Sequence, residues 1–95
     1  MKADKPLFPL GRIVATTGAL DALARANQSP QEFLNRHVAG EWGPELSEED
    51  EAENEYSLHH GFRILSSYKT AAGEKLWLIT EADRSATSLI LPEEY

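Results

Sequence analysis

The chain has 95 residues, enough for one compact domain and too few for two hydrophobic cores. It contains no cysteine, which excludes disulfides, zinc sites built from thiolates and cysteine nucleophiles. Nine basic against 16 acidic residues give a net charge of −7. We therefore expect no direct binding to nucleic acid or to an anionic membrane, because such binding depends on contacts from Lys and Arg.

No segment has the composition of a targeting or membrane-spanning sequence. The amino terminus, MKADKPLFPLGR, has two early lysines but lacks the apolar stretch of a secretory signal. The longest unbroken apolar run, Leu76 to Ile79, has four residues, whereas a spanning helix needs about 20. The sequence predicts a cytoplasmic protein.

The first 40 residues predict an arm, a strand and two helices. Residues 1–9, with two prolines, form the extended arm, and residues 10–16 contain the β-branched pair Ile13-Val14 expected of a strand. A first, alanine-rich helix is predicted over residues 18–26, capped by Thr16 or Thr17.

The next stretch, Ser29-Pro30-Gln31-Glu32, is the pattern of a capping box with proline at the first helical position. It predicts a second helix from Pro30 to about residue 39, ending at Gly40. The helical spacing indicates that this helix buries Phe33, Leu34, His37 and Val38.

A third helix is predicted from the capping pattern of Ser47 and Asp50 and ends at Gly61. Carboxylates fill its first turn and two histidines its last, and both arrangements complement the helix dipole. Its apolar side is thin and consists mainly of Ala52 and Tyr56, with Leu58 at one edge. We expect this helix on the surface, with its acidic side toward solvent.

From Phe62 onward the apolar period changes from 3.6 to 2, which is typical of strands. FRILSSYK, EKLWLITE and ATSLILP are three such segments, joined by loops short enough for hairpins. The middle segment is apolar on both faces, with Leu76 and Trp77 on opposite sides. We expect helices over one face, and over the other the amino-terminal arm, a second copy of the protein, or solvent.

The sequence therefore predicts a single α+β domain spanning residues 1–95. Its element order is β-α-α-α-β-β-β, with a three-to-four-stranded antiparallel sheet covered by helices. The amino-terminal strand is placed at one edge of the three-stranded meander.

The distribution of charge is uneven. Eight of the 16 acidic residues lie between Glu41 and Glu55, and no Lys or Arg occurs from residue 37 to residue 62. One interpretation is a solvated helix face that keeps the protein soluble. The other is a docking surface for a protein partner, or an acidic inhibitor that occupies a DNA-binding defence or restriction enzyme. The candidate interaction surface consists of Glu48, Glu49, Asp50, Glu53, Trp42 and Trp77.

The sequence has no glycine-rich phosphate loop, no nucleophile-elbow serine and no cofactor-binding pattern, so we expect no cofactor. Glu55 and His59 share a helix face, but the neighbouring His59 and His60 point about 100° apart, which disfavours a metal site. Asp83-Arg84-Ser85 groups an acid, a guanidinium and a hydroxyl in a loop. It leaves a small hydrolase or nuclease as the alternative, although such loops more often bond their own backbone.

The element order also resembles that of RelE-type ribonuclease toxins. That resemblance concerns topology alone, because those enzymes bind RNA through a strongly basic surface and this chain is acidic.

Three segments carry a further resemblance: GRIVATTGALDAL, SPQEFLNRHVAGEWG and GFRILSSYKTAAGEKLWLITEADRSATSLILPEEY. Together they resemble a family of small bacterial proteins carried on plasmids and integrated elements, usually labelled plasmid-related or hypothetical. Some members are labelled as a type I restriction enzyme subunit, which does not suit a 95-residue chain without a cofactor motif. The resemblance implies a setting on mobile DNA and brings no functional residues. The favoured function is a non-enzymatic protein that docks on a protein partner or on itself.

Overall fold

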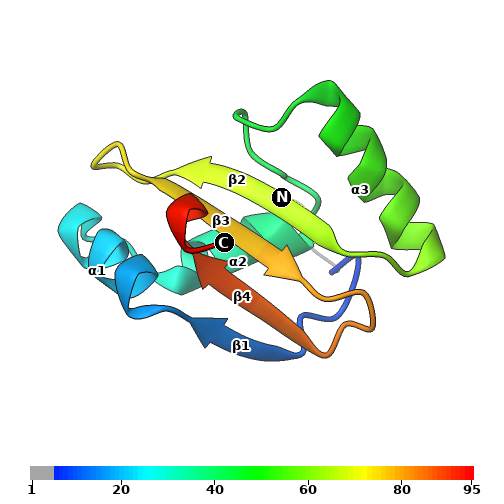
Figure 1. The fold of residues 1–95 in the computed structure, drawn as a ribbon, viewed down its shortest axis with the longest axis horizontal. Helices are drawn as coiled ribbons and strands as arrows, with labels where there is room; N and C mark the ends of the chain where they lie inside the picture. Colours follow the sequence, from blue (N-terminus) through cyan, green and yellow to red (C-terminus); the bar gives the residue numbers. More distant parts are fainter. Residues whose placement is uncertain (1–5) are drawn as a thin grey trace.

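Three helices and a four-stranded sheet make up residues 6–95, the part of the chain that this computed structural model describes (Figure 1). This confirms the predicted α+β class and element order. The elements are β1 (Arg12–Ala15), α1 (Thr17–Ala26), α2 (Pro30–Val38), α3 (Glu48–His60), β2 (Ile64–Lys69), β3 (Lys75–Thr80), β4 (Ala86–Ile90) and a short 3-10 turn, η1 (Pro92–Glu94). Among these helices none is long and apolar enough to cross a bilayer.

The strand order is β1-β4-β3-β2, so the amino-terminal strand lies at one edge of the meander, as predicted. The prediction of a wholly antiparallel sheet is wrong at that edge, because β1 pairs with β4 in parallel, with Arg12 opposite Ala86. The two meander pairings, β2 with β3 and β3 with β4, are antiparallel. Hairpin loops impose the antiparallel direction within the meander, whereas the three helices, β2 and β3 all lie between β1 and β4 in the chain, a connection long enough for a parallel pairing.

Two of the predicted helix caps form and one does not. The Thr16 hydroxyl accepts a hydrogen bond from Ala19 N–H at 3.0 Å, and the Ser47 hydroxyl accepts one from Asp50 N–H at 3.1 Å. Helix α2 begins at Pro30 as expected, but Ser29 makes no side-chain cap bond. The carboxylate of Glu32, expected to complete that capping box, accepts from the Gln28 amide at 2.9 Å instead.

Helix α2 lies behind the sheet in Figure 1 and helix α1 lies beside its left end, and both contribute to one core with the strands. The core between these layers consists of Ala19, Leu23, Phe33, Leu34, Tyr68, Leu76, Leu78 and Leu89. Burial of Phe33, Leu34 and His37 from α2 is confirmed, and Val38 is half-buried.

His37 lies at the start of a buried chain of polar side chains. Its Nδ1 shares a hydrogen bond with the Ser66 hydroxyl, and its Nε2 lies 2.9 Å from the Thr80 hydroxyl. Thr80 is in turn hydrogen-bonded to Thr87 at 2.7 Å, and Thr87 donates to the Leu10 carbonyl at 2.8 Å. Burial lowers the pKa of His37 to about 4, so the imidazole is neutral near pH 7.

Helix α3 runs beside β2, which is the second edge of the sheet (Figure 1). The prediction that its inner side is formed by Ala52 and Tyr56 is wrong, because both are exposed and the buried residues are Asn54 and Ser57. The Asn54 amide donates to the Leu65 carbonyl at 2.7 Å and accepts from Leu65 N–H at 3.0 Å. An edge strand presents unpaired backbone groups, so the side chain that suits this contact is an amide and not a methyl group.

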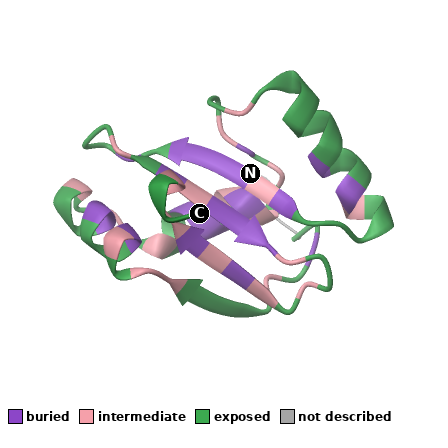
Figure 2. Ribbon diagram, in the orientation of Figure 1, coloured by how far each residue is buried: buried purple, intermediate pink, exposed green. Residues whose placement is uncertain are grey.

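The sheet face opposite α1 and α2 is partly covered by the carboxyl-terminal turn, which lies in front of β3 and β4 (Figure 2). The Tyr95 ring packs edge-on against Trp77 at a centroid distance of 5.7 Å, and the Tyr95 hydroxyl accepts from Arg63 at 3.0 Å. Of the two residues on opposite faces of β3, Leu76 is buried and Trp77 is half-buried. A cover from the carboxyl terminus was not among the expected alternatives, and dimerisation through this face stays a prediction.

Candidate functional site

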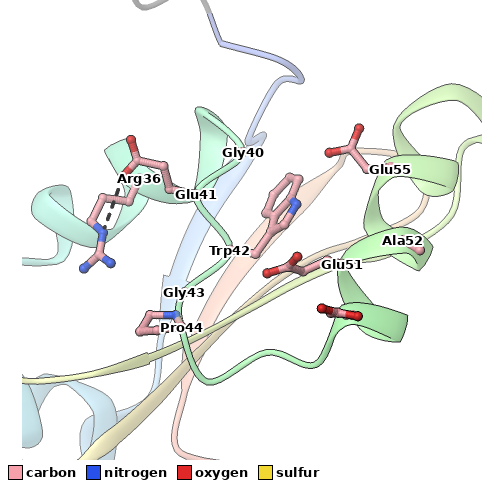
Figure 3. Close-up of a pocket in the computed structure, with 10 residues that line it drawn as sticks. Arg36, Gly40, Glu41, Trp42, Gly43, Pro44, Glu51, Ala52 and Glu55 are labelled. Carbon is pink, nitrogen blue, oxygen red and sulfur yellow. Dashed lines mark ion pairs between the residues drawn. The ribbon is translucent and has the colours of Figure 1, made fainter.

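A cleft of about 680 Å³ lies between the turn after α2 and helix α3 (Figure 3). One wall is the loop 40–44, and Arg36 lies at its end. The other wall is one stripe of α3, formed by Glu48, Glu51, Ala52 and Glu55. Ligand pockets commonly have volumes of about 300–1,000 Å³, so this cleft is large enough for part of a partner molecule.

The loop wall contacts strand β2 at three successive residues, through two hydrogen bonds and one close approach. The Tyr68 hydroxyl donates to the Glu41 carbonyl, and Ser67 N–H donates to the Trp42 carbonyl at 2.9 Å. Gly43 has a φ of +99°, and a Cβ at this position would collide with the Ser67 carbonyl oxygen. Only glycine allows so close an approach, and these contacts hold the wall in place without a ligand.

The helical wall carries three carboxylates on one face, because Glu48, Glu51 and Glu55 are three and four residues apart. None of them makes an ion pair or a side-chain hydrogen bond among residues 6–95. Glu41 stands on the opposite wall and pairs with Arg36 at 3.8 Å. The Arg36 guanidinium also lies over the Tyr68 ring at 4.5 Å. The cleft therefore holds four carboxylates and one engaged guanidinium.

Trp42 stands between the two walls and is only 5% exposed. Its ring packs against Phe8 and His37, at centroid distances of 6.3 Å and 6.0 Å. Figure 3 shows the nitrogen edge of the indole directed toward α3. The indole N–H has no acceptor within the part of the chain that the structure describes. The described residues contain no buried side-chain nitrogen or oxygen without a partner, so this N–H is a donor open to the solvent in the cleft.

The structure brings together only part of the predicted interaction surface. Glu48 and Trp42 line the cleft. Glu49 and Glu53 lie on an outer stripe of α3 beside Tyr56. The other two predicted residues, Asp50 and Trp77, line a separate hollow of about 290 Å³ together with Lys75.

Sequence reasoning missed Glu41, Glu51 and Glu55. The helical spacing of residues 48, 51 and 55 was available as a signal for one shared face. The position of Glu41 opposite that face could not be predicted from the sequence, because it depends on the hydrogen bonds between the loop and β2.

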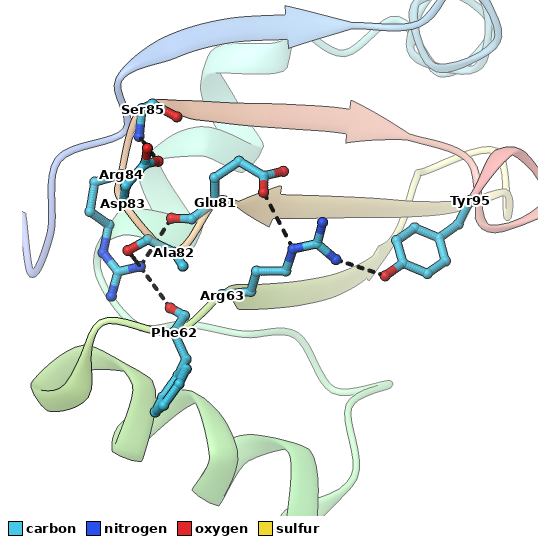
Figure 4. Close-up of polar contacts among 8 residues, drawn as sticks. All are labelled: Phe62, Arg63, Glu81, Ala82, Asp83, Arg84, Ser85 and Tyr95. Carbon is cyan, nitrogen blue, oxygen red and sulfur yellow. Dashed lines mark hydrogen bonds and ion pairs between the residues drawn. The ribbon is translucent and has the colours of Figure 1, made fainter.

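In the loop Asp83-Arg84-Ser85, the charged side chains are hydrogen-bonded to the protein backbone (Figure 4). The Arg84 guanidinium donates to four backbone carbonyls, those of Ser57 at 2.9 Å, Phe62 at 2.7 Å, and Glu81 and Ala82 at 3.1 Å each. The Asp83 carboxylate accepts from Ser85 N–H at 3.0 Å, and the hydrogen bonding from Ser85 lowers the pKa of Asp83. The guanidinium thus joins the β3–β4 loop to the end of α3.

Within residues 6–95 the last predicted polar residue, His59, belongs to no metal-binding group. His59 is exposed and makes no side-chain hydrogen bond within the described range. Across residues 6–95, no three His, Cys, Asp or Glu side chains are grouped closely enough to hold a metal ion. On the open sheet face, a hollow of about 290 Å³ is lined by Arg63, Leu65, Trp77, Ile79 and Tyr95. Figure 4 shows its one cation, Arg63, engaged by Glu81 and Tyr95.

Comparisons with protein-family models, with curated proteins and with solved structures give no match. The resemblance to plasmid-borne proteins stays a prediction.

Proposed function

We propose that this protein is a non-enzymatic docking protein whose acidic cleft and adjoining α3 surface bind a basic surface of another protein. The observation that carries the proposal is the cleft itself. Three carboxylates without an ion-pair partner among residues 6–95 face a fixed loop that adds a fourth, and the nearly buried Trp42 directs its solvent-open indole N–H into the same space. A solvated helix face would need neither the opposite wall nor the buried indole.

The charge of the protein supports the same function. The net charge is −7, and no Lys or Arg occurs along α3, so a positively charged partner is attracted from a distance. The helix begins with Glu48, Glu49, Asp50 and Glu51, whose charge also stabilises the first turn. Those residues therefore serve folding as well as binding, and any test has to separate the two effects.

The arrangement of Arg84 favours docking over the hydrolase alternative. A catalytic guanidinium needs donors free to contact a substrate, whereas this one is engaged by four carbonyls of its own chain. The Asp83 carboxylate is likewise engaged by the backbone of its own loop. These hydrogen bonds support a structural role for the loop.

The proposed setting is the cytoplasm of a bacterium that carries mobile DNA. A partner in a defence or restriction system would offer the required chemistry, since DNA-binding surfaces are rich in Lys and Arg. Inhibition of such an enzyme is one form that docking would take.

The test begins with affinity capture from extracts of the native host. The bait is the wild-type protein, compared with a variant in which every α3 glutamate is replaced by glutamine while Asp50 is kept at its capping position. Its substitutions are E48Q, E49Q, E51Q, E53Q and E55Q. A protein held by the first column and not by the second is then studied by association kinetics.

We expect the association rate to fall about tenfold in this variant and the dissociation rate to change little. Association should also weaken as salt rises beyond physiological strength, where the Debye length is about 8 Å. Equal retention on both columns, or association that ignores salt, would refute an acidic docking surface.

A further inference from the structure

The cleft contains two kinds of solvent-open groups that have no protein partner among residues 6–95, and together they specify a ligand more closely than charge does. Glu51 and Glu55 lie one helical turn apart on the wall that faces the Trp42 indole, and neither has a partner in the described chain. Trp42 offers one N–H donor in the same space. A ligand that satisfies all three supplies a cation and, beside it, a hydrogen-bond acceptor.

We propose that the cleft binds a single arginine side chain of an extended peptide segment, with the Trp42 N–H donating to a backbone carbonyl next to that arginine. The inference rests on the proposed function and names the part of the partner that enters the cleft. A peptide presents both required groups within one residue: the guanidinium at the end of the side chain and the carbonyl on the main chain.

Arginine suits the helical wall better than lysine or a metal ion. The guanidinium is planar and has five donors, so it can bond two carboxylates at once, whereas an ammonium acts as a point charge. The acidic side chains of residues 6–95 do not gather closely enough to hold one metal ion. A cation that bridges separate carboxylates is therefore favoured.

The geometry of Trp42 is fixed before any ligand arrives. Phe8 and His37 pack against its ring, and its carbonyl is bonded to Ser67 N–H in the sheet. Only 5% of the surface of Trp42 is exposed. A donor held in place loses little conformational freedom on binding, which favours recognition of a short segment.

The experiment follows the two indole N–H signals of the ¹⁵N-labelled protein by NMR, with W77F used to assign the Trp42 signal. The probe is the peptide acetyl-Gly-Arg-Gly-amide, with acetyl-Gly-Lys-Gly-amide and methylguanidinium chloride as comparisons. We expect the arginine peptide to shift the Trp42 signal and leave the Trp77 signal in place. The lysine peptide should bind more weakly, and methylguanidinium, which lacks a carbonyl, should leave the Trp42 N–H unmoved.

Two matched double variants separate a specific site from general attraction. E51Q/E55Q and E49Q/E53Q remove the same charge from α3, but only the first pair lines the cleft. We expect the first variant to weaken peptide binding about tenfold and the second to change it less than about twofold, a difference that corresponds to about 1 kcal/mol. Equal weakening by both, or no shift of the Trp42 signal at saturating peptide, would overturn the arginine inference.

These outcomes are distinct from failure of the proposed function. If a captured protein partner needs the α3 carboxylates but the peptide leaves Trp42 unmoved, docking stands and the arginine site does not. If the peptide binds as expected and no basic partner is retained, the site exists and the docking function fails.

Discussion

Protonation of His37 should make the stability of this protein depend on pH above the range in which carboxylates titrate. The imidazole is fully buried and bonded on both nitrogens to hydroxyl groups, those of Ser66 and Thr80. Burial lowers its pKa from the ordinary value of 6.5 to about 4. Between these two pH values the unfolded chain binds a proton that the folded chain does not, so acidification favours unfolding.

The size of the effect follows from the two pKa values. The contribution is fully present above pH 6.5, is lost progressively as the pH falls, and the loss levels off below about pH 4. A difference of 2.5 pKa units corresponds to about 3 kcal/mol in total, of which about 2 kcal/mol is lost by pH 5. That is a large share of the roughly 5–15 kcal/mol that stabilises a typical domain.

Urea titrations between pH 7.5 and pH 5 measure this dependence directly. The matched variants are H37Q, whose amide can still bond both hydroxyls, and H59Q, which removes an exposed histidine without a side-chain hydrogen bond in the described chain. We expect wild type and H59Q to lose the same stability and H37Q to lose much less. A parallel dependence in H37Q would refute the reasoning, as would an imidazole NMR signal of His37 that titrates near pH 6.5 in the folded protein.

Four further predictions concern stability and are measured by urea or thermal unfolding. Arg84→Ala should cost about 2–4 kcal/mol of stability, because four carbonyls lose a charged donor, and Arg84→Lys should restore only part of that loss. A loss below about 1 kcal/mol would show that the Arg84 hydrogen bonds do not stabilise the fold. Asn54→Ala should cost about 2–3 kcal/mol by leaving both backbone groups of one β2 residue unpaired, and unchanged stability would mean that α3 does not protect this edge. Gly43→Ala should cost at least about 2 kcal/mol and loosen the cleft wall, so a wild-type stability would show that the loop is not held against β2. Ser47→Ala should cost about 1 kcal/mol and Ser29→Ala less than about 0.5 kcal/mol, and the reverse order would show that the caps are misassigned.

Local patterns in the sequence were sufficient for the elements of this fold. The cap at Ser47, the proline at position 30 and the change of apolar period at Phe62 act over a few residues, so they predicted the helices and the meander without knowledge of the rest of the chain. The uneven charge was also evident in the sequence, and it identified the acidic surface of α3. The pattern at Ser29 shows the limit of this reasoning, because Glu32 found a competing partner in Gln28.

Only the tertiary structure decided which side chains share a surface. The inner side of α3 is set by the unpaired backbone of β2, which selects Asn54 over the more apolar Ala52. Arg84 is of a residue type found in active sites, and it lies between an acid and a hydroxyl. In the structure, however, it is hydrogen-bonded to carbonyls from two other segments as well as from its own loop. The cleft exists because hydrogen bonds from β2 hold Glu41 and Trp42 opposite a helix that follows them in the chain. Such contacts join residues that no local period relates, and so the sequence alone identified an acidic helix but not the site that it forms.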